Sequence, residues 1–250
     1  MTLLSLRDLS VTLRDRPVFS GVTLEIGAGE LVGLIGPNGA GKTTLMRAAL
    51  GLLGHAGQSS LATLDPRARA RAVAWMPQAR EIAWPVTVEA LVTLGRTPHR
   101  ARRLTDADHR AVTRAIDWMG LSDMRRRTAT RLSGGEQARA LIARALAQDT
   151  PLVMADEPIA GLDPAHQIAT METFAGLARA GRSVLVSLHD LGLAARHCSR
   201  LILLGQGRVM ADGPPGEVLT PALVAEVFGI TAYQAETEHG RIFQPLEVLE

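Results

Sequence analysis

The chain contains little cysteine, few aromatic residues and almost no lysine. Its single cysteine, Cys198, excludes an internal disulfide and any zinc site built from several cysteines, which fits a reducing compartment. Aromatic residues make up only 3% of the 250 residues. We expect the three tryptophans, Trp75, Trp84 and Trp118, in the core, with Trp84 also placed to contact a partner helix. Lysine occurs once, at Lys42, so arginine supplies the other side-chain positive charges.

Long apolar runs are missing as well. The mean hydropathy is +0.11, yet no stretch reaches the roughly 18 uninterrupted apolar residues that suggest a membrane-spanning helix. The N-terminal residues Met1–Asp8 show no basic segment followed by an apolar one, so we expect a chain that stays in the cytoplasm. The net charge of +2, from 27 basic and 25 acidic residues, gives little reason to expect a nucleic-acid partner.

Strand-like and helix-like segments alternate along most of the chain, which predicts an α/β fold with a mostly parallel sheet. Two short β-like runs between Val11 and Ile26 flank a turn at Asp15–Pro17 and predict an antiparallel β-subdomain at the N-terminus. Glycines at 205 and 207 indicate a later hairpin. The strands are expected at Leu31–Ile35, Val73–Met76, Leu152–Ala155, Ser183–Ser187, Arg200–Leu204 and Arg208–Asp212.

The stretch 89–148 has helical periodicity and no good strand, which predicts a helical subdomain inserted into the α/β core. Its helices are expected at Glu89–Leu94, at Asp106–Met119 after an N-cap at Thr105, and at Glu136–Ala147. We predict one compact unit over 1–250, with a core of about 1–88 and 149–250. Arginines of this stretch are expected on a solvated helix surface, the alternative being a basic face toward lipid headgroups or a partner: Arg96, Arg100, Arg102, Arg103, Arg125, Arg126, Arg127 and Arg131.

A glycine-rich segment, Gly36–Thr43, matches the pattern G-x-x-x-x-G-K-[ST] between a predicted strand and a predicted helix, the context of a phosphate-binding loop. Backbone N–H groups and the helix N-terminus would face a polyphosphate, Lys42 would neutralise it, and the Thr43 hydroxyl would bind Mg²⁺. A plain glycine turn with a surface lysine is the alternative. The expected phosphate-binding residues are Gly36, Pro37, Asn38, Gly39, Ala40, Gly41, Lys42, Thr43 and Thr44.

Two carboxylates, Asp156 and Glu157, end the predicted strand that begins at Leu152. At the carboxyl edge of a parallel sheet, Asp156 can reach the shell of a Mg²⁺ ion and Glu157 can polarise an attacking water. An acidic strand end in solvent is the alternative. Together with Lys42, the pair favours a site for nucleotide hydrolysis.

The segment Leu132–Glu136 opens a helix with two glycines behind a serine. Ser133, Gly134, Gly135 and Glu136 therefore predict a second anion-binding helix N-terminus. The same residues form an ordinary capping box, which is the structural alternative.

In combination these motifs resemble the ATP-binding cassette (ABC) ATPases over about residues 1–230. The resemblance implies ATP with Mg²⁺, Glu157 as the general base, Gln78 near Mg²⁺ or the attacking water, and Leu132–Glu136 as the signature that caps the γ-phosphate on an opposite subunit. It also implies roles for Asp163, in the D-loop, and His189, the switch histidine on the γ-phosphate. The implied Mg²⁺ residues are Thr43, Gln78 and Asp156.

The resemblance further implies a head-to-tail dimer of two copies with two ATP molecules between them. The family's adenine-stacking aromatic is replaced by Leu13, which predicts looser discrimination between bases. Ala160 stands where a serine is common, so communication between the two sites is expected to differ.

Only residues 79–131 separate Gln78 from the signature, without sustained heptads, which disfavours the coiled-coil members of DNA repair. We expect an importer subunit at the cytoplasmic face of the inner membrane, acting with separate permease subunits and indirectly with a substrate-binding protein. A soluble ABC ATPase that remodels a protein or nucleic-acid complex is the alternative. Several segments resemble the ATPases of iron-chelate, haem and cobalamin importers: Gly95–His99, Ala147–Pro151, His166–Gln167, His189–Arg196 and a closing strand at Arg241–Leu246. Zinc, manganese or another small substrate is the alternative.

Overall fold

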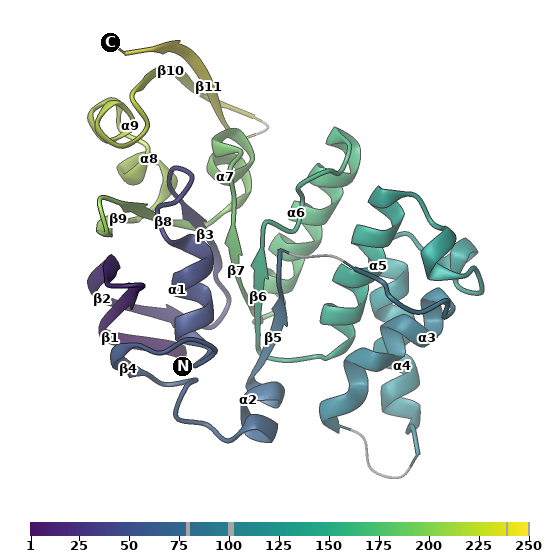
Figure 1. The fold of residues 1–250 in the computed structure, drawn as a ribbon. Coiled ribbons are helices and arrows are strands. Elements are labelled where there is room, and N and C mark those ends of the chain that lie inside the picture. The colour runs from purple at the N-terminus through teal and green to yellow at the C-terminus, as the bar shows by residue number, and fades with distance from the viewer. Residues whose placement is uncertain (79–80, 100–102, 239, 250) are drawn as a thin grey trace.

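The computed structural model describes residues 1–78, 81–99, 103–238 and 240–249. Its centre is a six-stranded sheet in the order β5-β6-β7-β3-β8-β9, in which all neighbours are parallel except β8 and β9 (Figure 1). The prediction of a mostly parallel sheet is therefore confirmed. The strands are β3 (Leu31–Ile35), β5 (Val73–Met76), β6 (Leu152–Asp156), β7 (Ser183–Ser187), β8 (Arg200–Gly205) and β9 (Arg208–Gly213).

The two faces of this sheet belong to two different apolar cores. Because successive side chains of a strand point to opposite faces, Val32 and Leu34 join one core while Leu31 and Ile35 join the other. The first core includes α1 (Lys42–Ala49) and the N-terminal strands. The second core includes α6 (Pro164–Arg179), α7 (Leu191–His197) and the inserted helices. Both faces are covered, which explains the continuous apolar strands.

An antiparallel sheet in the order β2-β1-β4 forms at the N-terminus, as expected. Its hairpin turns at Arg14 and Asp15, both with positive φ, so Arg16 and Pro17 already lie in β2. The predicted turn at Asp15–Pro17 is thus wrong in position, because the observed turn comes earlier in the sequence. Strand β4 was not expected, because its sequence Ala-Gly-Gln-Ser carries no strand pattern. The bounds are β1 (Thr2–Leu13), β2 (Arg16–Gly27) and β4 (Ala56–Ser59), and α2 (Pro66–Ala72) follows.

The inserted segment is helical, and it lies beside the β5 edge of the central sheet (Figure 1). The N-cap at Thr105 is confirmed, since its hydroxyl accepts the Asp108 N–H. The third helix begins at Gly134, two residues before the predicted start, because Ser133 caps it. The elements are α3 (Val88–Thr93), η1 (Leu94–His99), α4 (Asp106–Trp118), η2 (Ser122–Met124), η3 (Ala129–Arg131) and α5 (Gly134–Ala147).

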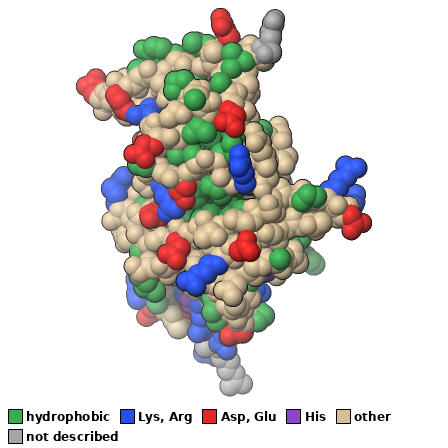
Figure 2. All heavy atoms as spheres, turned by 90° about the vertical axis from the view of Figure 1, so that its left-hand side faces the viewer, with side chains coloured by type: hydrophobic (Ala, Val, Ile, Leu, Met, Phe, Trp, Pro, Cys, Tyr) green, Lys and Arg blue, Asp and Glu red, His purple; other side chains and the backbone are tan. Residues whose placement is uncertain are grey.

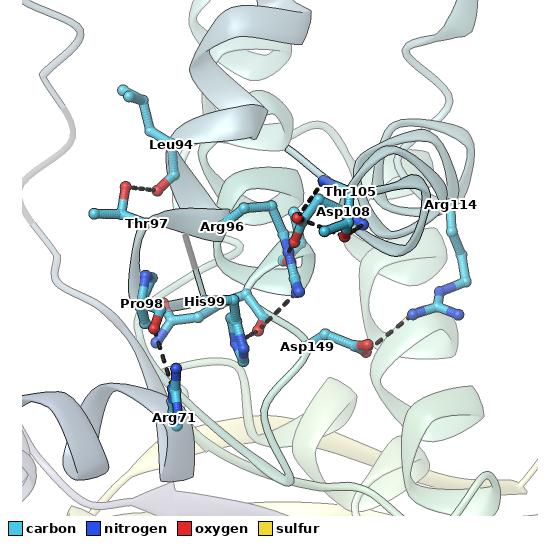
Figure 3. Close-up of polar contacts among 12 residues, drawn as sticks. Arg71, Leu94, Arg96, Thr97, Pro98, His99, Thr105, Asp108, Arg114 and Asp149 are labelled. Carbon is cyan, nitrogen blue, oxygen red and sulfur yellow. Dashed lines mark hydrogen bonds and ion pairs between the residues drawn. The ribbon is translucent and has the colours of Figure 1, made fainter. Parts of the chain in front are cut away.

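Arg96 is buried and not solvated, contrary to the expectation. Its Nε donates to Asp108 Oδ1 at 2.7 Å and its Nη1 donates to the Ala147 carbonyl oxygen at 2.9 Å (Figure 3). The buried guanidinium is tolerated because a buried carboxylate and a helix C-terminal carbonyl accept hydrogen bonds from it. Arg100 and Arg102 lie outside the described residues.

The tryptophans also depart from expectation. Trp84 is 74% exposed and Trp118 is 38% exposed, so neither is a core residue. The Arg114 guanidinium covers one face of the Trp118 ring and lies 5.2 Å from the ring centroid. Trp75 is only partly buried.

The Arg96–Asp108 pair should dominate the acid sensitivity of the helical segment. Hydrogen bonds from the Thr105 backbone, together with Arg96, lower the pKa of Asp108 to about 2. The carboxylate therefore contributes stability above its ordinary pKa near 4, and this contribution is lost as the pH falls toward about 2. Asp108→Ala should cost about 3–5 kcal/mol because it leaves a buried cation unpaired. Urea unfolding at pH 7 measures this loss.

Asp106→Ala is the matched control, because Asp106 lies exposed on the same helix turn. It should cost less than about 1 kcal/mol. Equal losses for the two variants would contradict the assignment of stability to the buried pair.

A two-stranded antiparallel sheet closes the chain after α8 (Pro215–Val218) and α9 (Pro221–Phe228). The predicted closing strand lies within β11 (Gly240–Val248), while β10 (Ile230–Thr237) was not expected. Phe243 of β11 is buried against the helices of the second core. Among the described helices, none combines the length and the apolar composition needed to cross a bilayer.

Candidate nucleotide-binding site

The glycine-rich loop joins β3 to α1 at the carboxyl edge of the sheet, as predicted. Gly36 adopts φ +150°, and a Cβ at this position would lie 2.2 Å from the Leu204 carbonyl oxygen of the neighbouring strand. Gly41 adopts φ +96° directly before the helix, and a Cβ there would lie 2.9 Å from Val18. A side chain at Gly36 would push the loop away from the sheet edge, and one at Gly41 would press on β2 in a backbone conformation that residues with a Cβ rarely adopt.

Lys42, the only lysine of the chain, lies inside the curl of this loop. Its Nζ donates to the carbonyl oxygens of Gly36 at 2.7 Å and Pro37 at 3.1 Å, and the residue is 6% exposed. Burial lowers the pKa of Lys42, although the negative charges of Glu157 and Asp156 oppose this effect. A buried ammonium at a helix N-terminus attracts anions, so this geometry suits a phosphate group.

Asp156 ends β6 and is almost completely buried, at 1% exposure. Its Oδ1 accepts a hydrogen bond of 2.6 Å from the Ser187 hydroxyl, whereas its Oδ2 is buried with no hydrogen-bond partner in the described structure. Mg²⁺ is usually held by one or two carboxylates together with substrate phosphates. A buried carboxylate oxygen of this kind beside a phosphate loop therefore fits a bound Mg²⁺ ion.

Glu157 lies next along the chain and contacts two other predicted residues. Its Oε2 accepts from Gln78 Nε2 at 2.9 Å, and its Oε1 lies 2.5 Å from His189 Nε2. Its backbone adopts φ +48°, an unusual conformation for a residue with a side chain. The structure thus brings together Gln78, Glu157 and His189, three residues from separate segments.

These side chains surround one pocket at the phosphate loop. It has the small loop residues on one side and an acid, an amide and an imidazole on the other, which is an arrangement that can hold a polyphosphate and activate a water molecule. Gly36 and Pro37 line an adjoining groove together with His189. The pocket is lined by Val18, Asn38, Gly39, Ala40, Gly41, Lys42, Thr43, Thr44, Gln78, Glu157 and His189.

The predicted signature, Leu132–Glu136, lies outside the loop pocket. Ser133 caps α5, its hydroxyl accepts the Glu136 N–H at 3.3 Å, and the Glu136 carboxylate accepts the Ser133 N–H at 2.8 Å. The backbone hydrogen bond from Ser133 lowers the pKa of Glu136. Within the described part of the chain, Ser133–Glu136 and Asp163 are not among the residues that line the loop pocket. Asp163 instead caps α6 and contacts His166.

Two residues of the site were not predicted. Val18 lines the pocket from β2, and Ser187 links Asp156 to the Glu157 backbone. Ser187 is the polar last residue of the predicted apolar strand and stands two residues before His189, which is the signal that could have revealed it. Leu13, expected near the base, is 43% exposed at the end of β1.

Residues 19–160, more than half of the chain, match the ABC transporter family. The hemin import ATP-binding protein HmuV of Pseudomonas aeruginosa is 41% identical over 91% of this chain and 93% of its own length. The chain belongs to the ABC transporter family. The resemblance of its motifs to ABC ATPases is thereby confirmed.

Other ABC proteins support the same assignment. The cobalamin import ATP-binding protein BtuD of Halobacterium salinarum is 41% identical over 90% of this chain, which spans 58% of that protein's length. A solved ABC transporter in an inward-facing conformation has a TM-score of 0.85, with 24% identity over 99% of this chain and 98% of the solved chain. This structural likeness confirms the predicted α/β fold with a mostly parallel sheet.

Proposed function

We propose that this chain is the ATP-hydrolysing subunit of an ABC importer. The observation that carries the proposal is the contact of Glu157 with Gln78 and His189 at the mouth of the loop that holds Lys42. A carboxylate in this position can accept a proton from a water molecule that attacks the γ-phosphate, and the neighbouring amide and imidazole can orient that water.

The phosphates of ATP would lie on the backbone N–H groups between Gly36 and Thr44, apart from Pro37, which has none, with Lys42 as the counter-charge. Thr43, Gln78 and Asp156 would hold Mg²⁺, which neutralises phosphate charge when bound. The loop carbonyls that now accept from Lys42 would release its ammonium to the phosphates. Burial disfavours an isolated ammonium, so the exchange of neutral partners for an anion stabilises its charged form.

The second half of each site would come from another copy of the chain. Ser133, Gly134, Gly135, Glu136 and Asp163 do not line the loop pocket of their own chain, yet α5 presents an exposed N-terminus of the kind that binds anions. We propose that this N-terminus caps the γ-phosphate on a partner copy in a head-to-tail dimer. ATP would then hold the two copies together, and hydrolysis would release them.

The transported substrate is proposed to be haem or cobalamin, by likeness to the relatives named above, or an iron chelate, by the resemblance of the sequence segments. Residues 1–250 would form one ATPase domain, with the helical segment of about 89–148 inserted between core segments of about 1–88 and 149–250. The chain would bind permease subunits at the cytoplasmic face of the membrane and depend indirectly on a substrate-binding protein.

Purification of the tagged chain from solubilised membranes of its native host tests this function. An integral membrane protein should co-purify, and the complex should hydrolyse ATP in a Mg²⁺-dependent reaction. Recovery with only soluble proteins or nucleic acid would instead support an ABC ATPase that remodels such a complex.

The leucine at position 13 should weaken the discrimination between adenine and guanine nucleotides. An exposed leucine offers apolar contact but no aromatic face to orient one base over another, so we expect similar kcat/KM values for ATP and GTP. Leu13→Tyr should restore a preference for ATP, measured by steady-state hydrolysis of both nucleotides. A strong ATP preference in the wild-type chain would refute this.

A further inference from the structure

One buried hydroxyl connects the two acidic residues of the site. Ser187, at the carboxyl end of β7, is 0% exposed, and the pairing of β6 with β7 places it directly beside Asp156. Its Oγ donates to Asp156 Oδ1 at 2.6 Å and accepts the Glu157 N–H at 2.8 Å. The hydroxyl donates its single proton to the carboxylate and accepts the N–H with an oxygen lone pair, so it can make both hydrogen bonds at once.

The first bond decides which oxygen of Asp156 remains available. Ser187 occupies Oδ1, and Oδ2 is left buried without a hydrogen-bond partner in the described residues. A carboxylate held through one oxygen cannot rotate freely about its terminal torsion. Such outer hydrogen bonds orient metal-binding side chains and tune their affinity.

The second bond acts on the backbone of Glu157. This residue adopts φ +48°, which residues with a Cβ rarely populate and which persists only where neighbouring groups hold it. The conformation brings the carboxylate to Gln78 and His189. Ser187 accepts the backbone N–H of Glu157 and so holds this residue at the point where the unusual conformation begins.

We infer that Ser187 is a positioning residue for ATP hydrolysis: it orients the Asp156 carboxylate for Mg²⁺ and holds the Glu157 backbone in the conformation that places the base. This inference rests on the proposed function. Ser187 acts through its two neighbours and does not line the loop pocket.

Ser183, at the opposite end of β7, makes the same kind of contacts and provides a matched control. It too is 0% exposed, its Oγ donates to the Gly27 carbonyl oxygen at 2.7 Å, and it accepts the Glu30 N–H at 3.2 Å. Ser183→Ala therefore removes one donor and one acceptor from the same strand, at the end where β7 pairs with Leu152 and not with Asp156. A purely structural role for Ser187 would make the two alanine variants alike.

The test measures Mn²⁺ binding to the full chain by electron paramagnetic resonance in the presence of ADP, together with kcat and KM for ATP. Ser187→Ala should weaken Mn²⁺ binding and lower kcat by about 10- to 100-fold, the usual effect of losing an outer hydrogen bond at a metal site. Metal-free binding of ADP should stay unchanged. Ser187→Thr, which keeps the hydroxyl, should restore both values to nearly those of the wild type.

Ser183→Ala should lower thermal stability about as much as Ser187→Ala and leave Mn²⁺ binding intact. Unchanged Mn²⁺ binding in Ser187→Ala, or an equal loss in both variants, would overturn the inference. If Ser187→Ala does not fold, Ser187→Cys keeps the volume with a weak donor and should weaken Mn²⁺ binding in the same direction. Absence of ADP-dependent Mn²⁺ binding in the wild type would refute the proposed function itself, and the inference with it.

Discussion

Glu157→Gln is expected to bind ATP, to lose about 10²- to 10⁴-fold in kcat, and to accumulate as a dimer when ATP and Mg²⁺ are present. A glutamine amide keeps the size of the side chain and an oxygen that can accept from Gln78, but it cannot take a proton from water. ATP would then remain intact between two copies. Single-turnover hydrolysis and light scattering after size-exclusion chromatography measure the two effects.

Glu226→Gln, the same change at an exposed residue of α9 that does not line the loop pocket, should leave both properties as in the wild type. Retention of rapid hydrolysis by Glu157→Gln would reject the role of Glu157 as the base. Loss of ATP binding in this variant would indicate that the carboxylate is needed to build the pocket and not to perform the chemistry.

Ser133→Arg is expected to abolish hydrolysis and leave ATP binding to the single chain unchanged. Ser133 is exposed and outside the chain's own loop pocket, so a long side chain can be accommodated in the free subunit. In the head-to-tail dimer it would occupy the space of the γ-phosphate of the partner's ATP. Binding of a fluorescent ATP analogue and steady-state hydrolysis separate the two effects.

Ser133→Ala controls for the lost helix cap. It removes the hydroxyl that accepts the Glu136 N–H, at a cost of about 1 kcal/mol in stability, without adding bulk. It should therefore keep much more hydrolysis than Ser133→Arg. If both variants lose activity alike, the effect would come from the cap and not from a clash across two copies.

The sequence predicted the sheet and the phosphate loop because their signals are local. The apolar runs from Leu31 and from Ser183 match β3 and β7 without a shift at either end. The loop at Gly36–Thr44 and the acidic pair Asp156 and Glu157 stand at strand ends, where topology alone brings them to one edge of the sheet.

The features that the sequence did not predict depend on contacts with a partner segment. Strand β4 exists because β1 pairs with it, and β10 because β11 does, and neither has a pattern of its own. Arg96 is buried because of Asp108, and Ser187 belongs to the site because β6 lies beside β7. Trp84 is exposed although tryptophan is a large apolar residue of the kind that usually packs in a core, and residue type alone does not show whether another segment covers it.

The central claim is that each ATP is held between the phosphate loop of one copy and the α5 N-terminus of another. Asn38 and Ser133 are both exposed, and Cys198 is the only natural cysteine and is buried, so engineered cysteines can be labelled selectively. In the Glu157→Gln background, one preparation carries Asn38→Cys and a second carries Ser133→Cys. The two are mixed with ATP and Mg²⁺ and treated with a short bis-maleimide.

We predict a cross-link between the two different chains that forms only when both preparations and ATP are present. Cross-links only between identical chains, or no cross-link while ATP is bound, would contradict the account.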